Sequence, residues 1–207
     1  MKLNALLLLL IGSLTALAQA QTTEVAPDLL VKNVTNEVLQ IIRSDKDIQA
    51  GSNKKAVELI ESKVLPYFNF PHMTQIAVGR DWKAASPQQQ KQLADEFHTL
   101  VVRTYAKALT EYRSQTVEFK PFKMAAGDTD IKVRSQVSQP SGKAIPLDYF
   151  LEKLSGGWKV YDIEVDGISL VINYRETFAA EVRSSGIDGL IKSLQGKNKI
   201  GASGDKK

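Results

Sequence analysis

The sequence predicts a mostly helical α+β domain packed on an antiparallel sheet of about four strands, because the spacing of its apolar residues changes twice along the chain. From Pro27 to Tyr112 the apolar residues recur every three or four positions, which indicates helices. From Val117 to Tyr161 they alternate with polar residues, and Gly, Pro and Asp separate the alternating segments. Helical spacing returns at Ile168. Because the chain has no internal repeat and no linker, we expect a single domain.

The N-terminal residues have the order of a secretory signal peptide. Lys2 precedes an apolar run over residues 5–17, and Ala18-Gln19-Ala20 forms a small-residue cleavage site. The run is shorter than the roughly 20 residues that cross a bilayer. We therefore predict that residues 1–20 are removed near Ala20 and that the chain is exported. The alternative is a buried helix at the start of the domain.

Composition excludes several functional classes. The formal net charge is +4, and removal of Lys2 with the leader lowers it to +3. Basic residues are scattered rather than clustered, so we do not expect nucleic-acid binding. The chain contains no cysteine, which excludes disulfides, cysteine-ligated metals and lipidation on an N-terminal cysteine. No second long apolar segment follows the leader, and we expect a mature protein that is not membrane-integral.

The helical part divides into several segments. Pro27 begins a first helix that reaches Ile42, residues 45–53 form a polar loop, and a second helix covers residues 54–64 before Pro66. Crowded aromatic and aliphatic residues between positions 67 and 82 indicate short helical turns packed on the core. Ser86 with Gln89 three positions later predicts a capping box at the start of a long helix with one apolar stripe.

The second half of the chain is read as strands followed by helices. Alternation predicts strands near residues 117–119, 131–134, 145–151 and 158–161. A helix over residues 168–183 and a shorter one over residues 187–194 would follow. The domain then spans residues 21–195, and the Gly- and Lys-rich residues 196–207 are expected to form a flexible polar tail.

No pattern of catalytic residues is present. The sequence lacks a G-x-S-x-G elbow, a phosphate-binding P-loop and a G-x-G-x-x-G fingerprint, so we expect no enzymatic activity and no cofactor. Asp95 and His98 share a helix face and could bind a metal with a third ligand, but a solvated face is the simpler interpretation, and we expect no metal site. Ser169 is more simply a helix cap than a nucleophile.

Several segments of the chain resemble one known family, the MlaC/toluene-tolerance family of periplasmic phospholipid-binding proteins. The likeness runs from about Pro27 to Leu194, and its parts are individually weak but occur in a specific order. The segments that carry it are Leu65-Pro66-Tyr67-Phe68-Asn69-Phe70, residues 78–89 from Val78-Gly79-Arg80-Asp81-Trp82 to Ser86-Pro87-Gln88-Gln89, Thr104-Tyr105 with Ala108-Leu109 and Tyr112, Gly157-Trp158-Lys159-Val160-Tyr161-Asp162, Gly167-Ile168-Ser169-Leu170, and Gly186-Ile187-Asp188-Gly189-Leu190-Ile191.

The resemblance implies a soluble carrier in the periplasm that holds phospholipid acyl chains in an apolar cleft between sheet and helices. It further implies shuttling between an outer-membrane lipoprotein–porin complex and an inner-membrane ABC transporter with an MCE-type subunit, which maintains the lipid asymmetry of the outer membrane. Bound phospholipid would be cargo rather than a cofactor. An alternative is an adaptor or chaperone of the envelope that binds protein segments in the same cleft.

On this basis fourteen apolar or aromatic residues are candidates for the walls of the cleft. Ile168 carries most weight, because it begins the segment where strand is expected to turn into helix. For the others, an ordinary filled core is the alternative. From the sheet and the following helix the candidates are Val133, Leu147, Tyr149, Leu151, Val160, Ile163, Ile168, Val171 and Tyr174, and from the preceding helices they are Met73, Val78, Leu100, Val101 and Tyr105.

Overall fold

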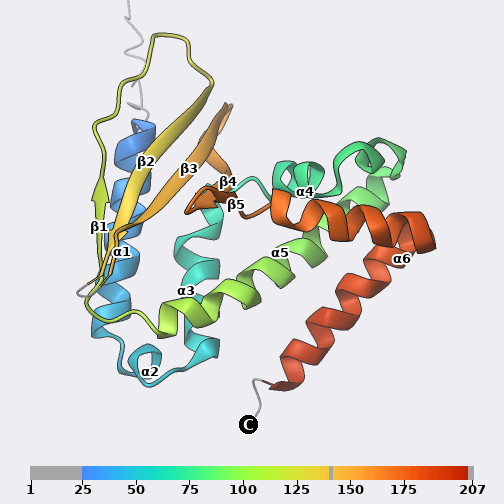
Figure 1. The fold of residues 1–207 in the computed structure, drawn as a ribbon, viewed down its shortest axis with the longest axis horizontal. Coiled ribbons are helices and arrows are strands. Elements are labelled where there is room, and N and C mark those ends of the chain that lie inside the picture. The colour runs from blue at the N-terminus through green and yellow to red at the C-terminus, as the bar shows by residue number, and fades with distance from the viewer. Residues whose placement is uncertain (1–24, 140–141, 205–207) are drawn as a thin grey trace, which may run out of the picture.

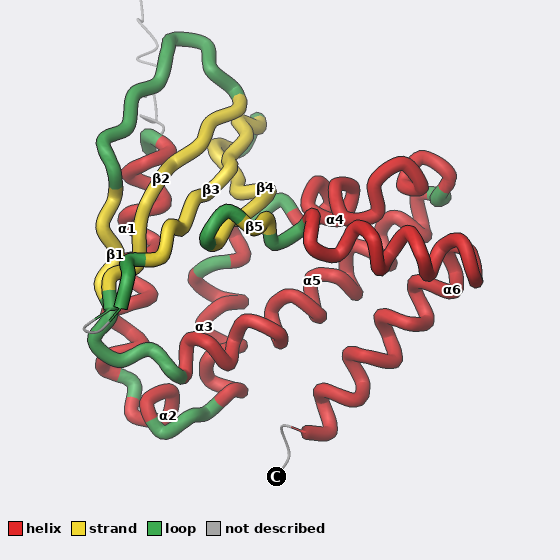
Figure 2. Tube along the Cα trace, viewed as in Figure 1, coloured by secondary structure: helices red, strands yellow, loops and turns green. Residues whose placement is uncertain are grey.

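The computed structural model describes residues 25–139 and 142–204, so the expected signal peptide lies outside the described residues. Figures 1 and 2 show a sheet on one side of the molecule and most of the helices on the other, with α1 running along the sheet. The helices are α1 (Pro27–Ser44), α2 (Lys46–Gln49), α3 (Asn53–Lys63), α4 (Phe70–Val78), α5 (Pro87–Thr110) and α6 (Arg175–Gly204), with short 3-10 helices at Leu65–Tyr67, Gly79–Ala84 and Ile172–Tyr174.

The sheet confirms the predicted α+β class and adds one strand to the four expected. Its strands are β1 (Thr116–Phe119), β2 (Asp130–Ser138), β3 (Ile145–Leu154), β4 (Gly157–Val165) and β5 (Ile168–Ser169). They are all antiparallel to their neighbours and follow one another in chain order, which makes β1 and β5 the two edge strands.

The helix expected from Ile168 begins later than predicted. Asp166 and Gly167 both have positive φ, at 50° and 81°. An Asp-Gly pair in this conformation makes the tight turn that suits an antiparallel hairpin. The chain therefore folds back on β4, and Ile168 lies in β5 rather than at a helix start. Regular α-helix starts only at Arg175.

Capping explains the starts of two helices. Ser86 Oγ accepts a hydrogen bond from the Gln89 N–H at 3.3 Å, and Gln89 Oε1 accepts from the Ser86 N–H at 2.9 Å, which confirms the capping box. The predicted loop over residues 45–53 contains the short helix α2. Asp45 begins it by accepting from the N–H groups of Asp47 and Ile48.

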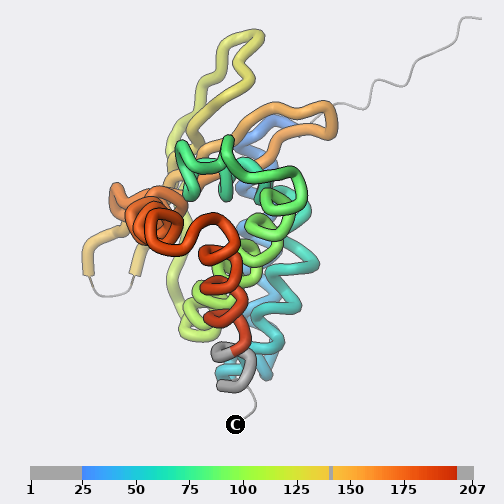
Figure 3. Tube along the Cα trace, turned by 90° about the vertical axis from the view of Figure 1, so that its right-hand side faces the viewer, coloured from blue at the N-terminus to red at the C-terminus, as the bar shows by residue number. Residues whose placement is uncertain are grey.

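Residues 196–204, which the sequence assigns to a polar tail, continue α6 as far as Gly204. Gly186, with φ of 72° and ψ of −177°, bends α6 sharply between its two halves (Figure 3). The second half returns along α5. Asn198 is buried there, donates from Nδ2 to Glu96 Oε2 at 2.7 Å, and accepts at its backbone oxygen from Arg103. Local composition could not reveal this long-range packing.

The two largest clusters of the core, a sheet cluster and a helical cluster, meet at one residue, and two smaller clusters lie among α1, α2, α3 and α5. The sheet cluster buries Ile131, Val133, Tyr149, Leu151, Trp158 and Val160 with Val31 of α1. The helical cluster joins α4, α5, α6 and the segment before α6 around Phe97 and Phe178. Phe68 packs against both clusters and forms a parallel β-bridge with Val160. Among the described residues no helix combines the length and apolar character that a membrane span needs.

We expect Asn198→Ala to lower the free energy of unfolding by about 1–2 kcal/mol, because it removes the buried amide that donates to the partly buried backbone and carboxylate oxygens of Glu96. Lys197→Ala is the matched control, since Lys197 is exposed on the same turn and should change stability by less than about 0.5 kcal/mol. Urea unfolding of both variants measures the difference. Equal stabilities would mean that the C-terminal turns do not pack on α5.

Candidate functional site

The inner face of the sheet, which faces α1, presents a continuous row of side chains across all five strands. The strand register places Phe119 of β1 opposite Ser135, Ser135 opposite Leu147, Leu147 opposite Val165, and Val165 opposite Ile168 of β5. Residues directly opposite in adjacent antiparallel strands share one face. We call these five residues the transverse row.

Exposure increases along the transverse row from the centre of the sheet to β5. Ser135 is 3% exposed, Val165 41% and Ile168 63%. The single polar member adds no free donor, because Ser135 Oγ donates to the Leu147 carbonyl at 2.6 Å. The row is therefore an apolar track that α1 and Phe68 cover incompletely.

The sheet half of the fourteen predicted residues comes together on this inner face. Val133 pairs with Tyr149, which pairs with Ile163, and the next row contains Leu151 and Val160. Leu147 is a member of the transverse row. The six residues pack in the sheet cluster, with Leu147 and Ile163 partly buried.

The helix half lies in the other cluster. Met73, Val78, Val101 and Val171 are buried in the helical cluster, and Leu100 and Tyr174 pack against it. The structure therefore divides the predicted set between two contiguous cores instead of gathering it around one cavity. Five surface cavities can be described, and none of the fourteen residues lines any of them.

Two of the fourteen residues belong to neither cluster. Ile168 is the most exposed large apolar residue described, and Tyr105 of α5 is 38% exposed. Partial burial, with a hydrogen bond to Tyr174, raises the pKa of the Tyr105 phenol. Exposed Ile168 lies beside Val165, which is 41% exposed, so the β5 edge is the part of the inner face that is open to solvent.

A buried carboxylate holds the β5 edge in place. Asp162 Oδ2 accepts from Ser169 Oγ at 2.5 Å, while Oδ1 accepts from the N–H groups of Ile163 at 2.8 Å and Val171 at 3.3 Å. Ser169 Oγ also accepts from the Ile172 N–H at 3.0 Å, so it supports the start of the 3-10 helix Ile172–Tyr174. Burial raises the pKa of the Asp162 carboxyl, and these hydrogen bonds oppose the shift.

The histidines are engaged in packing and pairing. His98 packs edge-on against Phe70 with ring centroids 4.7 Å apart, burial lowers its pKa, and Asp95 pairs with Lys91 at 2.7 Å. His72 Nδ1 lies 2.7 Å from Glu152 Oε1. Over residues 25–139 and 142–204 no three His, Asp or Glu side chains are grouped so that they could hold a metal.

Sequence reasoning missed three residues of the inner face and its junction. Phe119 and Val165 were not chosen, because only the register shows that they continue the row through Leu147. Phe68 was placed in a resembling segment but not at the junction of the two clusters. A signal was available for Phe119, which alternates with polar neighbours in a strand adjoining the predicted set.

The fold and this face define a single-domain α+β protein whose sheet offers a continuous and partly uncovered apolar track. Residues 32–196 match the model of the MlaC protein family. The chain belongs to the MlaC family.

Curated relatives and a solved structure agree with this membership. The chain is 28% identical over 193 residues to the intermembrane phospholipid transport system binding protein MlaC of Haemophilus influenzae, covering 88% of this chain and 87% of the relative. It is 28% identical over 192 residues to toluene tolerance protein ttg2D of Pseudomonas putida, covering 92% and 86%. The phospholipid-binding protein of Ralstonia solanacearum, solved in complex with a phospholipid, has a TM-score of 0.79 and 41% identity over 86% of this chain and 99% of its own.

The raised pKa of Asp162 makes the stability of the folded protein depend on pH, and it sets the sign of that dependence. Its folded-state pKa lies above the unfolded value of about 4. Its contribution to stability is therefore fully present below about pH 4 and is lost as pH rises through the folded pKa. Asp162→Asn keeps an acceptor for two backbone N–H groups but cannot ionise. We expect wild type to lose stability relative to this variant as pH rises from about 4 to 7.

Urea unfolding of both proteins across that pH range measures the difference. Asp148→Asn is the control, because Asp148 is a carboxylate of the neighbouring strand β3 that pairs with Lys132 at 2.9 Å. A stability difference between wild type and Asp162→Asn that stays constant with pH would contradict a raised Asp162 pKa.

Proposed function

We propose that this protein binds the acyl chains of phospholipids against the inner face of its sheet and carries them through the periplasm. The transverse row is the observation that carries the proposal. Family membership supports it, as does the phospholipid complex of the structural relative from Ralstonia solanacearum. The name of the Haemophilus influenzae relative supports a place in transport between membranes.

The dimensions of the row suit an acyl chain. Five strands span four inter-strand spacings of about 4.8 Å, which gives about 19 Å from β1 to β5. One leaflet contributes about half of a hydrocarbon core that is about 30 Å thick. An acyl chain of about 15 Å can therefore lie along the row from end to end. Leu147, Val165 and Ile168 would contact its methylenes.

The fourteen residues take different roles in this proposal. Leu147, Ile163 and Ile168 are already partly exposed and form the surface on which a chain first lies. Tyr105 and Tyr174, which interact with each other on the helical side, are proposed to contact the chain from there. Buried residues such as Tyr149 and Met73 form the walls behind, and they contact the chain only where the two clusters separate around cargo.

Energetics explain why such a site can release its cargo. Burial of one methylene contributes about 0.8 kcal/mol relative to water, so two acyl chains with about 30 methylenes would contribute about 24 kcal/mol. That gross value exceeds the practical limit of about 18–21 kcal/mol for noncovalent binding. The relevant reference is the bilayer, against which an apolar track is nearly isoenergetic. Docking to a partner protein can then shift the equilibrium toward loading or release of the phospholipid.

The remaining roles follow from the family rather than from geometry. We propose an outer-membrane lipoprotein–porin complex and an inner-membrane ABC transporter with an MCE-type subunit as the partners, with the protein reaching both after the leader is removed. The carrier then contributes to outer-membrane lipid asymmetry. No catalytic step is needed, and Ser169 serves as a cap.

Native mass spectrometry of the mature protein, purified from periplasm without detergent, tests the proposed function. We expect adducts with the masses of intact diacyl phospholipids. A bare mass, with no uptake from liposomes, would overturn the proposal. Binding of unfolded client proteins without lipid would instead support an adaptor or chaperone of the envelope, and hydrolysis of the bound lipid would reveal an enzyme.

Ile168→Glu tests the β5 end of the track. We expect the variant to fold, because Ile168 is 63% exposed, and to lose phospholipid occupancy by about ten-fold or more, because a carboxylate in hydrocarbon costs about 2.5–3.5 kcal/mol. Leu29→Glu is the matched control, since Leu29 is a 49% exposed apolar residue of α1 outside the track. Occupancy is measured by native mass spectrometry after incubation with liposomes. Equal phospholipid occupancy in the two variants would show that Ile168 is not part of the binding site.

A further inference from the structure

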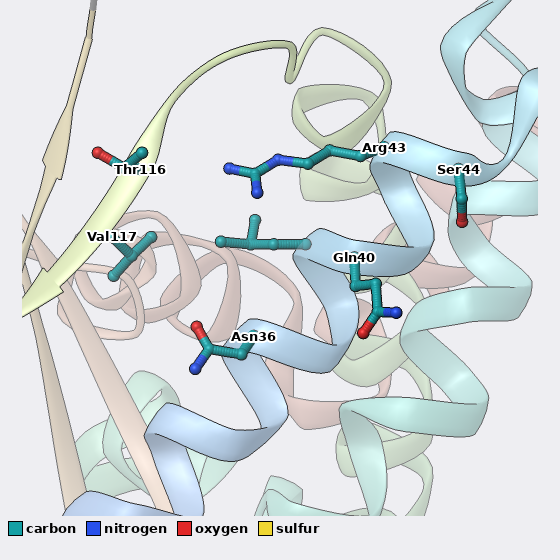
Figure 4. Close-up of a pocket in the computed structure, with 7 residues that line it drawn as sticks. Asn36, Gln40, Arg43, Ser44, Thr116 and Val117 are labelled. Carbon is teal, nitrogen blue, oxygen red and sulfur yellow. The ribbon is translucent and has the colours of Figure 1, made fainter.

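A cavity of about 500 Å³ lies between α1 and the edge strand β1, at the opposite end of the sheet from Ile168. Figure 4 shows the Arg43 side chain extending from α1 toward β1, where Thr116 and Val117 lie across from it. The lining residues are Asn36, Leu39, Gln40, Arg43, Ser44, Thr116 and Val117. The cavity thus combines one cation, several hydrogen-bonding side chains and two apolar residues.

The guanidinium of Arg43 is held in position by groups that do not neutralise its charge. Nη2 donates to the Gln115 carbonyl at 3.0 Å and to Tyr112 Oη at 3.4 Å, and the guanidinium carbon lies 5.8 Å from the centroid of the Tyr112 ring. None of the ion pairs formed by the described residues includes Arg43. Its bonds use Nη2, which leaves Nε and Nη1 to donate to an anion.

The cavity adjoins the inner face of the sheet through Val117. Val117 lies two residues before Phe119 in β1, so both side chains lie on the same face. Phe119 stacks on Tyr149 at a centroid distance of 6.5 Å. Tyr149 in turn hydrogen-bonds the side chain of Thr35 on α1, next to Asn36 in the cavity lining. An amphiphile with its anion at Arg43 would therefore extend its apolar part over Val117 onto the transverse row.

The backbone of the edge strand adds a further polar group. Lys120 N–H donates to the Arg134 carbonyl, and hydrogen-bonded pairs alternate along an antiparallel ladder. The N–H and carbonyl of Val117 therefore point to the free edge of β1. Phosphate oxygens accept readily from a guanidinium fork and from backbone N–H groups.

We propose that Arg43 and the cavity around it bind the phosphodiester group of the phospholipid whose acyl chain lies on the transverse row. This assignment rests on the proposed function. One fixed guanidinium recognises the phosphate that all phospholipids share, and the amides of Asn36 and Gln40 supply neutral contacts. The site should therefore discriminate phospholipid from lipid without phosphate, and discriminate weakly among headgroups.

The test compares a phospholipid with the diacylglycerol that carries the same acyl chains. Wild-type protein should take up the phospholipid from liposomes about ten-fold better than the diacylglycerol, which reflects a charge-assisted contact. Arg43→Gln should take up the two lipids equally well, and its uptake of each should match the uptake of diacylglycerol by wild type. Arg43→Lys should lose less of the preference for phospholipid over diacylglycerol, because lysine keeps the positive charge but lacks the bidentate geometry of the guanidinium.

Arg113→Gln is the matched control. Arg113 is also exposed and also donates to backbone carbonyls near the end of α5, but it does not line the cavity. It should keep the wild-type preference for phospholipid. Thermal unfolding of each variant shows whether the fold is retained, and binding is scored on folded protein.

The outcomes separate this proposal from the function on which it rests. If Arg43→Gln keeps the full preference for phospholipid, the phosphate site is overturned while the carrier function stands. If wild type binds neither lipid, the carrier function itself fails. If inorganic phosphate binds wild type but not Arg43→Gln, and even an excess leaves bound phospholipid in place, the cavity is a site for free phosphate and the lipid assignment is overturned.

Discussion

The in-register antiparallel pairing of five strands is the constraint on which the rest of this structure depends. A slip of one residue in any strand would move its side chains to the opposite face and break the transverse row. A register shift between Phe150 and Leu151 adds one residue to β4 and still returns Ile163 and Val165 to the inner face. Asp162 lies at this irregularity, and its bonds to Ser169 and Val171 fix where β5 pairs.

The helix layer is tied to the sheet by polar contacts at a short junction near the start of α4. Asn69 N–H donates to the Val160 carbonyl at 2.8 Å, and its Nδ2 donates to Glu152 Oε1 at 2.7 Å. The same carboxylate oxygen lies 2.7 Å from His72 Nδ1. Phe68 adds an apolar contact to both clusters. The boundary between sheet and helices elsewhere is largely apolar, which suits a boundary that is to receive hydrocarbon without leaving buried polar groups unpaired.

The two ends of the inner face differ in chemistry, and the difference suits an amphiphile. The β5 end exposes Val165 and Ile168, whereas the β1 end places an unneutralised guanidinium beside Val117. A site built in this way derives most of its binding from non-directional apolar contact and only its orientation from a charge. Under the proposed function, such a balance would leave bound phospholipid close in free energy to its place in a membrane.

The sequence by itself determined the class of fold, most element positions and the family. Helical spacing defined α1, α3 and α5, a capping box defined the start of α5, and alternation defined the four longer strands, because these signals are local. The set of apolar residues was also visible, and its sheet half does share one face. Only tertiary structure decided the rest. Register selected Phe119 and Val165, the positive φ of Asp166 and Gly167 turned Ile168 into a strand, and packing on α5 ordered residues that composition marks as a tail. Arg43 faces its cavity because α1 lies beside β1 there, and no spacing along the chain encodes that arrangement.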